Sequence, residues 1–442
     1  MEPVDYIISG DYILTVNQSN ELIRNGAIAI KDGIIIAIGS TDAIFNKYSA
    51  KEVIYGQGRA VMPGFVNTHT HAAMVYFRGL SDDLPLKDWL EKHIWPAENR
   101  WLSPEFIYDA LGLACLEMLS AGITTYHDMY FFGDAAAQKT KELGMRAVLG
   151  VGILDFPSVS AKTTDEYLEN AIRFIKNWQN DELITPSIAP HAIYTCSPET
   201  LKKSKLISEK YGTPIHTHLS ETEWEIKNSL LKYGKKPVKL LDSLGFLDET
   251  LTLAHCIWID DDEIELLAEN KVGVSHCMES NLKLASGFAP IVTMLNAGIK
   301  VTFGTDSAAS NNDLNIMSEM ATTAKVHKAL ANDPTVLDAK TAIMMATRWG
   351  AEVLGLGEKI GSIEVGKIAD IITINLKKPH LLPLYDVYSH IVYAARSSDV
   401  EDVMVNGRLL IKNGKHTSAD EQEILQKAEQ WGKKIADHNS QA

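Results

Sequence analysis

The pattern of hydrophobic and polar positions divides the chain into three parts. The first part, residues 1–60, contains short apolar runs rich in β-branched residues, and such runs predict strands. The runs lie at residues 6–8, 12–14, 27–30 and 34–36. Asn25-Gly26 and Asp32-Gly33 lie between them and are typical of hairpin turns.

In the second part, residues 60–310, apolar runs alternate with amphipathic helical stretches. This is the pattern of βα units around a parallel sheet. Eight strands are predicted, at residues 60–67, 122–127, 145–152, 184–190, 213–218, 250–255, 272–276 and 299–305. Eight such repeats in about 250 residues fit a (β/α)8 TIM-type barrel, whose active sites lie at the carboxyl ends of the strands.

Strand character returns in the third part, at residues 361–374 and 403–410, where Asn406-Gly407 predicts a hairpin. These strands are too few for a sheet of their own. We therefore expect them to pair with the N-terminal strands. The predicted fold is α/β, with the barrel at residues 61–360. Residues 1–60 and 361–442 are expected to form a small β-sandwich domain, followed by a C-terminal helix.

Composition and charge narrow the function. With 442 residues and 45% hydrophobic positions, the chain can bury a large core. Its net charge of −15 argues against nucleic acid and anionic membrane as partners. No apolar run has transmembrane length, and no signal-peptide core is visible. Four widely spaced cysteines suggest reduced thiols in a cytoplasmic protein. The oligomeric state is left open, a homo-oligomer included.

Histidines are concentrated at the ends of the predicted strands. His69 and His71 follow the first strand and point to one face, because strand side chains alternate. The other strand ends carry His127 with Asp128, His191, His216 and His218 with Glu221, His255, His276, and Asp306. Any one of these histidines could be an ordinary core residue. That explanation does not account for so many at one end of one barrel, so we expect a metal-centred active site.

The strand ends resemble the motifs of the amidohydrolase superfamily, and the resemblance covers nearly the whole chain. The similar segments are PGFVNTHTH at 63–71, HLSET at 218–222, His255-Cys256, SNLKLASG at 280–287 and GTDSAASNN at 304–312. The last two are most similar to deaminases of methylthioadenosine and S-adenosylhomocysteine. Triazine chlorohydrolases and guanine deaminases share most of the five motifs.

The resemblance implies the ligands of a metal ion. They are His69, His71, His218 and Asp306. Three imidazoles and a carboxylate suit Zn²⁺, with Fe²⁺ or Mn²⁺ as alternatives. His216 is a rival for His218, but Glu221 follows His218 at the family's spacing, which leaves His216 a packing or hydrogen-bonding role. The fourth strand ends in His191 and offers no lysine to bridge two metals, so one ion per chain is expected.

The resemblance also implies the catalytic and substrate-binding residues. Asp306 would accept the proton of the attacking water, His255 would hydrogen-bond to that water, and Glu221 would protonate the ring nitrogen. Residues 83–98 are expected to lie over the barrel mouth. The predicted substrate-binding residues are Trp95 against the nucleoside, Glu98 on the ribose hydroxyls, His191 and Glu221.

One departure from the family concerns the substrate's 5′ end. Some members have an arginine just after the third strand, where this chain reads GVGILDF at 150–156. Recognition of the carboxylate of S-adenosylhomocysteine then needs another residue or a neighbouring subunit. Methylthioadenosine is apolar at that end and needs no cation.

We therefore predict metal-dependent hydrolytic deamination of an adenine nucleoside. The expected substrates are 5′-methylthioadenosine and, secondarily, S-adenosylhomocysteine, each giving its inosine analogue and ammonia. The alternatives with the same metal site are a deaminase of another purine or a pterin, and a triazine chlorohydrolase. A metal-stabilised binding protein without activity is a further alternative. Glu221, His255 and Asp306 argue against it, because a binding protein needs no water-activating residues.

Overall fold

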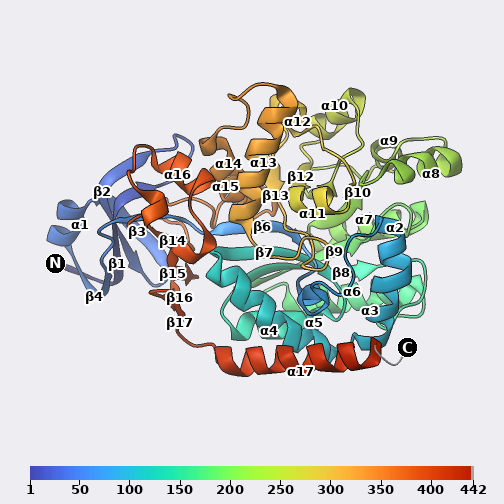
Figure 1. Ribbon diagram of the computed structural model, residues 1–442, viewed down its shortest axis with the longest axis horizontal. Coiled ribbons are helices and arrows are strands. Elements are labelled where there is room, and N and C mark those ends of the chain that lie inside the picture. Colours follow the sequence, from blue (N-terminus) through green and yellow to red (C-terminus); the bar gives the residue numbers. More distant parts are fainter. Residues whose placement is uncertain (440–442) are drawn as a thin grey trace.

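The computed structural model describes the backbone of residues 1–439 and the side chains of residues 1–437. It contains an eight-stranded barrel sheet and, beside it, a nine-stranded sheet made from both ends of the chain (Figure 1). The barrel strands are β6 (Phe65–Thr70), β7 (Ile123–Tyr130), β8 (Arg146–Ile153), β9 (Ile184–Pro190), β10 (Ile215–Leu219), β11 (Leu251–His255), β12 (Gly273–His276) and β13 (Val301–Phe303).

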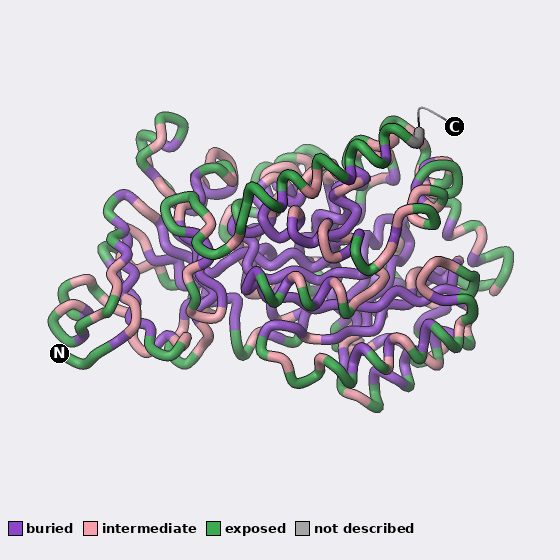
Figure 2. Tube along the Cα trace, turned by 90° about the horizontal axis from the view of Figure 1, so that it is seen from below, coloured by how far each residue is buried: buried purple, intermediate pink, exposed green. Residues whose placement is uncertain are grey.

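Helices cover the outside of the barrel. They are α4 (Pro104–Ser120), α5 (Gly133–Glu142), α6 (Thr164–Trp178), α7 (Pro198–Tyr211), α8 (Glu223–Tyr233), α9 (Pro237–Ser243), α10 (Asp261–Glu269), α11 (Met278–Lys283), α12 (Ile291–Asn296), α13 (Ile316–Ala331), α14 (Ala339–Ala346) and α15 (Arg348–Val353). The strands are buried and the exposed positions lie on the surrounding helices and loops (Figure 2). Every residue of β7 and β8 is buried, which is why parallel strands appear in the sequence as continuous apolar runs.

The strands follow one another in chain order from β6 to β13, and each ladder between neighbours is parallel. Several hydrogen bonds join the first strand to the end of the last strand. The Asp306 backbone N–H donates to the His69 carbonyl oxygen at 3.0 Å, and Thr68 Oγ1 donates to the Phe303 carbonyl oxygen at 3.0 Å. The TIM-type barrel predicted from the sequence is confirmed.

The strand predicted at residues 60–67 is in fact two strands that belong to different sheets. β5 (Arg59–Pro63) pairs with strands of the other sheet, and β6 begins at Phe65. Between them, Gly64 lies so close to Thr124 that a Cβ atom would come within 2.2 Å of its side chain. Gly64 also donates its N–H to the Asp370 carbonyl oxygen at 3.0 Å. The apolar pattern continues from β5 into β6, so the sequence does not show where one strand ends and the next begins.

The second sheet joins both ends of the chain, as predicted. Its strands run in the order β17-β16-β15-β14-β5-β1-β2-β3, and β4 also pairs with β1. Their bounds are β1 (Glu2–Leu14), β2 (Leu22–Lys31), β3 (Ile34–Ser40), β4 (Tyr48–Ile54), β14 (Ile371–Asn375), β15 (Val400–Val405), β16 (Arg408–Lys412) and β17 (Lys415–His416). All the strands therefore belong to one hydrogen-bonded sheet.

Neighbouring residues of β1 belong to different apolar cores, because neighbouring side chains of a strand alternate between its two faces. Ile8 belongs to one core and Ile7 to the other. The second core is covered by α1 (Thr41–Lys47), whose Ile44 is buried in it.

Two of the three predicted hairpin turns are present. Asp32-Gly33 and Asn406-Gly407 both have positive φ at each residue, as a two-residue hairpin turn requires. The prediction for Asn25-Gly26 is wrong, because both residues lie inside β2. Gly26 is paired with Gly10 there, and a Cβ atom on Gly26 would come within 2.6 Å of Ile13. Close packing rather than a turn explains this glycine.

The C-terminal helix α17 (Glu421–Asn439) packs along α4 (Figure 1). Trp431 donates Nε1–H to Asp109 at 2.9 Å, and its ring centroid lies 5.1 Å from that of Phe106. The apolar stripe of this helix is thus used for packing. None of the helices in residues 1–439 is both long and apolar enough to cross a membrane.

A buried ion pair connects the barrel to the second sheet. Arg146 at the start of β8 donates from Nε to Asp370 Oδ2 at 2.8 Å and from Nη2 to Oδ1 at 3.3 Å. Both side chains are almost fully buried. Removing one charge would leave the other buried without its partner.

We expect Asp370→Asn to lower the free energy of unfolding by about 3–5 kcal/mol, as for other broken buried pairs. Urea unfolding followed by circular dichroism measures this change. Glu52→Gln is the control, because it removes an exposed pair with Lys412 and should leave the midpoint nearly unchanged. Equal midpoints for the two variants would contradict the structural role of Asp370.

Candidate active site

Four side chains from the first, fifth and last strands meet at the carboxyl end of the barrel. Nε2 of His71 lies 3.2 Å from Nε2 of His218. Nε2 of His69 and Nε2 of His71 each lie 3.4 Å from Asp306 Oδ1. The structure therefore brings together all four residues that the sequence predicts as metal ligands. We call this group the centre.

The hydrogen bonds of the ring Nδ1 atoms decide which nitrogen faces the centre. The contacts are His69 Nδ1 with His216 Nε2 (3.0 Å), His71 Nδ1 with the Met129 carbonyl (2.6 Å) and His218 Nδ1 with the His191 carbonyl (2.9 Å). A ring that donates Nδ1–H to a carbonyl carries its lone pair on Nε2. The rings of His71 and His218 are thus prepared as ligands before any ion binds.

The donor set fits a divalent metal ion. His69 Nε2 is fully buried and has no hydrogen-bond partner, although it points into the centre. Burial lowers the pKa of His69 to about 4, so the ring is neutral, the form that binds metal. Ligand atoms of His69, His71 and Asp306 all lie within 4.8 Å of one another. Three imidazoles and a carboxylate are donors that Zn²⁺, Fe²⁺ or Mn²⁺ accept.

Asp306 is held as a carboxylate by its surroundings. Burial alone would raise its pKa, but the interaction with His69 and the histidine charges hold that pKa well below the usual value. Ser280 and Ser310 donate hydroxyl hydrogen bonds to Oδ2 at 2.6 and 2.9 Å. Oδ1, on the side of the histidines, accepts the Ser307 N–H at 2.7 Å. The left-handed φ of 58° at Asp306 is strained backbone of the kind found at functional sites.

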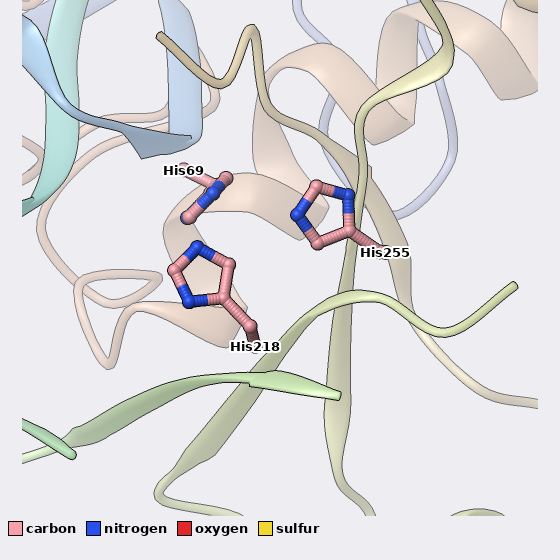
Figure 3. Close-up of side chains that lie close together, drawn as sticks. All are labelled: His69, His218 and His255. Atoms are coloured by element: carbon pink, nitrogen blue, oxygen red, sulfur yellow. The ribbon is translucent and has the colours of Figure 1, made fainter. Parts of the chain in front are cut away.

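His255 lies beside the centre, at the end of β11. Figure 3 shows its ring with those of His69 and His218, and one nitrogen of each ring lies within 4.8 Å of the others. Its ring centroid is 5.4 Å from that of His69, against 4.9 Å for His218. Nδ1 contacts Asn281 Oδ1 at 2.9 Å, which directs Nε2 inward. Burial lowers the pKa of His255, but the charges of Glu221 and Asp306 outweigh this and raise it overall.

Glu221 follows β10 and is buried at the edge of the centre. Its Oε2 lies 3.8 Å from His255 Nε2, and its backbone N–H donates to Glu225 at 3.0 Å. Burial raises the pKa of Glu221, with the charge of Asp306 adding to the effect and that of His255 opposing it. A carboxyl group with a raised pKa can carry a proton at neutral pH and deliver it to a bound molecule.

The short helix α11 supports two of these residues at once. It carries Ser280, which contacts Asp306, and Asn281, which contacts His255. The first turn of α11 is held in turn by the buried Glu319, which accepts the Met278 N–H at 2.9 Å. The sequence pattern assigns no individual role to Ser280 and Asn281. The signal that could have indicated one is their position, because they are polar residues shortly after a barrel strand.

A cavity of about 380 Å³ opens over the centre. It is covered by residues 86–101, which form the consecutive helical turns α2 (Leu86–Trp89), η2 (Leu90–Ile94) and α3 (Trp95–Trp101). The residues that the sequence predicts to bind substrate all line it, namely Trp95, Glu98, His191 and Glu221. Glu98 accepts a hydrogen bond from Tyr130 at 2.6 Å, and its burial raises its pKa to about 7. Tyr130 was not predicted, because its strand extends beyond the run that the sequence indicated.

The remaining strand-end residues lie outside the centre. His127 stacks on His216 with ring centroids 4.0 Å apart, and Asp128 accepts the Ala72 N–H at 2.7 Å. His276 is buried at the end of β12, and neither of its ring nitrogens has a hydrogen-bond partner in residues 1–437. His216 contacts Nδ1 of His69 and is not itself a member of the centre, which agrees with the hydrogen-bonding role predicted for it.

Comparison with known proteins identifies the family. The sequence profile described as "Amidohydrolase family" matches residues 60–410, which include every strand and side chain of the site. The chain belongs to the amidohydrolase family. This is a family of metal-dependent hydrolases, in agreement with the donor set of the centre.

Relatives of this amidohydrolase match it along almost its whole length. A 5-methylthioadenosine/S-adenosylhomocysteine deaminase of Thermodesulfovibrio yellowstonii is 54% identical over 97% of this chain and 98% of its own. A 5′-deoxyadenosine deaminase of Methanosarcina acetivorans is 43% identical over 96% of each chain. The crystal structure of an adenosine deaminase from Xanthomonas campestris with bound zinc superposes with a TM-score of 0.97. That protein is 39% identical, over 98% of this amidohydrolase and 99% of its own chain.

His216→Phe tests whether the contact to His69 Nδ1 prepares the centre for metal. We expect metal affinity to fall about 10- to 100-fold, the usual effect of removing a residue that orients a ligand. Competition with a chelator measures the affinity. His276→Phe is the matched control, since that ring is equally buried at the same barrel end and has no hydrogen bond to lose. An equal loss in both variants would contradict a specific role for His216.

Proposed function

We propose that this amidohydrolase deaminates adenine nucleosides at C6, with 5′-methylthioadenosine as substrate and S-adenosylhomocysteine as a second, weaker one. The observation that carries the proposal is the position of a protonatable carboxyl, Glu221, beside a histidine and carboxylate centre, with both lining the same cavity. The names of its relatives support the same substrate class.

His69, His71, His218 and Asp306 would hold one Zn²⁺ ion, and Fe²⁺ or Mn²⁺ would fit the same donors. The ion, when bound, lowers the pKa of a water molecule and so makes a nucleophile available at neutral pH. The zinc in the Xanthomonas campestris structure supports this choice of metal. A single ion per chain is proposed because β9 ends near His191 and no lysine lines the cavity in residues 1–437.

The protein's own residues would move the protons. Asp306 accepts a proton from the attacking water, and His255 Nε2 hydrogen-bonds to the water oxygen. Glu221 donates its proton to N1 of the purine, which makes C6 electrophilic as the oxygen adds to it. Asp306 then returns its proton to the amino group, which leaves as ammonia. The proton of the added hydroxyl passes to Glu221, so that water and the 6-amino group give the 6-oxo product and ammonia.

The cavity wall would bind the sugar. Glu98 would accept hydrogen bonds from the ribose hydroxyls, while the Tyr130 hydroxyl donates a hydrogen bond to Glu98 Oε1 and orients the carboxyl group. Trp95 would pack on the nucleoside and His191 would lie on the ribose side, while its carbonyl oxygen orients His218. Deamination of another purine or a pterin, or hydrolysis of a triazine, would use the same centre. Because those compounds have no ribose, Glu98 would have no hydroxyl groups to bind.

Ultraviolet absorbance tests the proposed reaction directly. Purified zinc-loaded protein is mixed separately with methylthioadenosine, S-adenosylhomocysteine and adenosine, and the adenine spectrum should change to that of hypoxanthine. No change with any of the three, in protein shown to contain its metal, would overturn the assignment to adenine nucleosides. Guanine, pterins and triazines would then be tested in the same assay.

Glu221→Gln tests the proton donor. The amide has the same shape but cannot deliver a proton, so kcat should fall by about 10²–10⁴-fold while the metal content is kept. Glu223→Gln is the control, because Glu223 lies two residues away on α8, is exposed and pairs with Lys227. A kcat near that of the unmodified protein in Glu221→Gln would remove Glu221 from this role.

A further inference from the structure

Away from the proposed metal site, the cavity over the centre offers no lysine or arginine side chain within residues 1–437. Its lining includes three carboxylates, Glu98, Glu221 and Asp306, together with four histidines. An anionic group at the end of the cavity away from the metal site would find no lysine or arginine as a partner.

The purine occupies the end of the cavity that contains the centre, because C6 must reach the water there. The ribose and its 5′ substituent then occupy the rest of the cavity. The wall there is apolar and includes Phe131, Leu154, Phe156, Val159 and Trp95. Trp95 and Phe156 contact each other across the cavity, with ring centroids 5.8 Å apart. Asp155 is a charged residue in the segment 154–159. Its carboxylate is engaged within the protein, since it accepts hydrogen bonds from Ser197 and Thr200.

We propose, building on the proposed function, that this site selects adenine nucleosides whose 5′ substituent is uncharged and apolar. A 5′-methyl or 5′-methylthio group buries its surface against the apolar wall. A 5′ chain that ends in a carboxylate either loses the hydration of that charge without gaining a partner or stays outside the cavity. The protein is then a deaminase of 5′-deoxy and 5′-methylthio nucleosides that turns over S-adenosylhomocysteine poorly.

A second cavity offers a route by which a longer 5′ chain could find a cation. This cavity, of about 390 Å³, adjoins the first and shares Leu86, Leu90 and Trp95 with it. Lys87 lines it, and Lys87 Nζ lies 3.9 Å from Glu91 and 5.9 Å from the ring centroid of Trp224. Because Lys87 is exposed to solvent and lies beside the acidic Glu91, we do not assign a carboxylate site there, and Lys87→Gln checks that choice.

Four nucleosides separate charge from size. They are 5′-deoxyadenosine, 5′-methylthioadenosine, S-adenosylhomocysteine, and the uncharged 5′-butylthio analogue, whose chain has the same length as that of S-adenosylhomocysteine but carries neither carboxylate nor ammonium. We expect kcat/KM for the first two to exceed that for S-adenosylhomocysteine by at least about tenfold, and the analogue to recover most of this loss. Equal values for S-adenosylhomocysteine and its analogue would overturn the inference. So would efficient turnover of S-adenosylhomocysteine that is lost in Lys87→Gln.

A binding measurement keeps this inference distinct from the proposed reaction. Calorimetric titration of the four nucleosides into Glu221→Gln, loaded with zinc, ranks their affinities without turnover. If no nucleoside is deaminated by the unmodified protein, the proposed reaction fails, while the ranking still decides the 5′ preference. Equal affinity for all four nucleosides would contradict the preference even if deamination is observed.

Phe156→Arg places a cation on the apolar wall. The ratio of kcat/KM for S-adenosylhomocysteine to that for methylthioadenosine should rise by at least about tenfold, because the carboxylate gains a charged partner. The analogue without the carboxylate should show no such gain. Phe156→Leu removes the ring without adding charge and should leave the ratio unchanged. An equal rise in both variants would show that size rather than charge controls the 5′ end.

Discussion

The hydrogen bond from the Asp306 N–H to the His69 carbonyl oxygen connects the last barrel strand to the first. It lies at the point where the side chains of the same two residues meet, 3.4 Å apart. Residues at opposite ends of the barrel's sequence thus become neighbours only when the barrel closes. The centre cannot form from part of the barrel, because its histidines and its carboxylate come from β6, β10 and the end of β13.

The eight βα units and the polar residues at their strand ends could be predicted from the sequence, because hydrophobic periodicity follows burial, but the break between β5 and β6 could not. The sequence could not show which nitrogen of each ring is available, since that depends on contacts between distant strands. His216 contacts His69 although the two are far apart in the chain, and Asn281 contacts His255 from the next βα unit. Gly64 and Gly26 were misinterpreted for a related reason, since close packing of distant segments fixes both.

Chemistry and substrate choice use different parts of the molecule. The centre stands on strand ends and on the short helix α11, which are held by buried hydrogen bonds. The wall that would meet the sugar and its 5′ substituent comes from connecting segments, residues 86–101 and 152–159. Loops tolerate substitution better than strands do. Relatives with the same centre can therefore differ in the 5′ group that they accept, as the two names given to the relatives suggest.

The position of β5 has a consequence for how the protein is made. β5 pairs with β14, which is synthesised only after the entire barrel, yet a single glycine separates β5 from the strand that carries His69. During translation, β1 to β5 therefore emerge long before their partner and must wait with an open sheet edge. Such late, non-local pairing is slow and exposes unpaired strands to association with other chains. On the ribosome, the second sheet can be completed only after β14, near the end of the chain, has been synthesised.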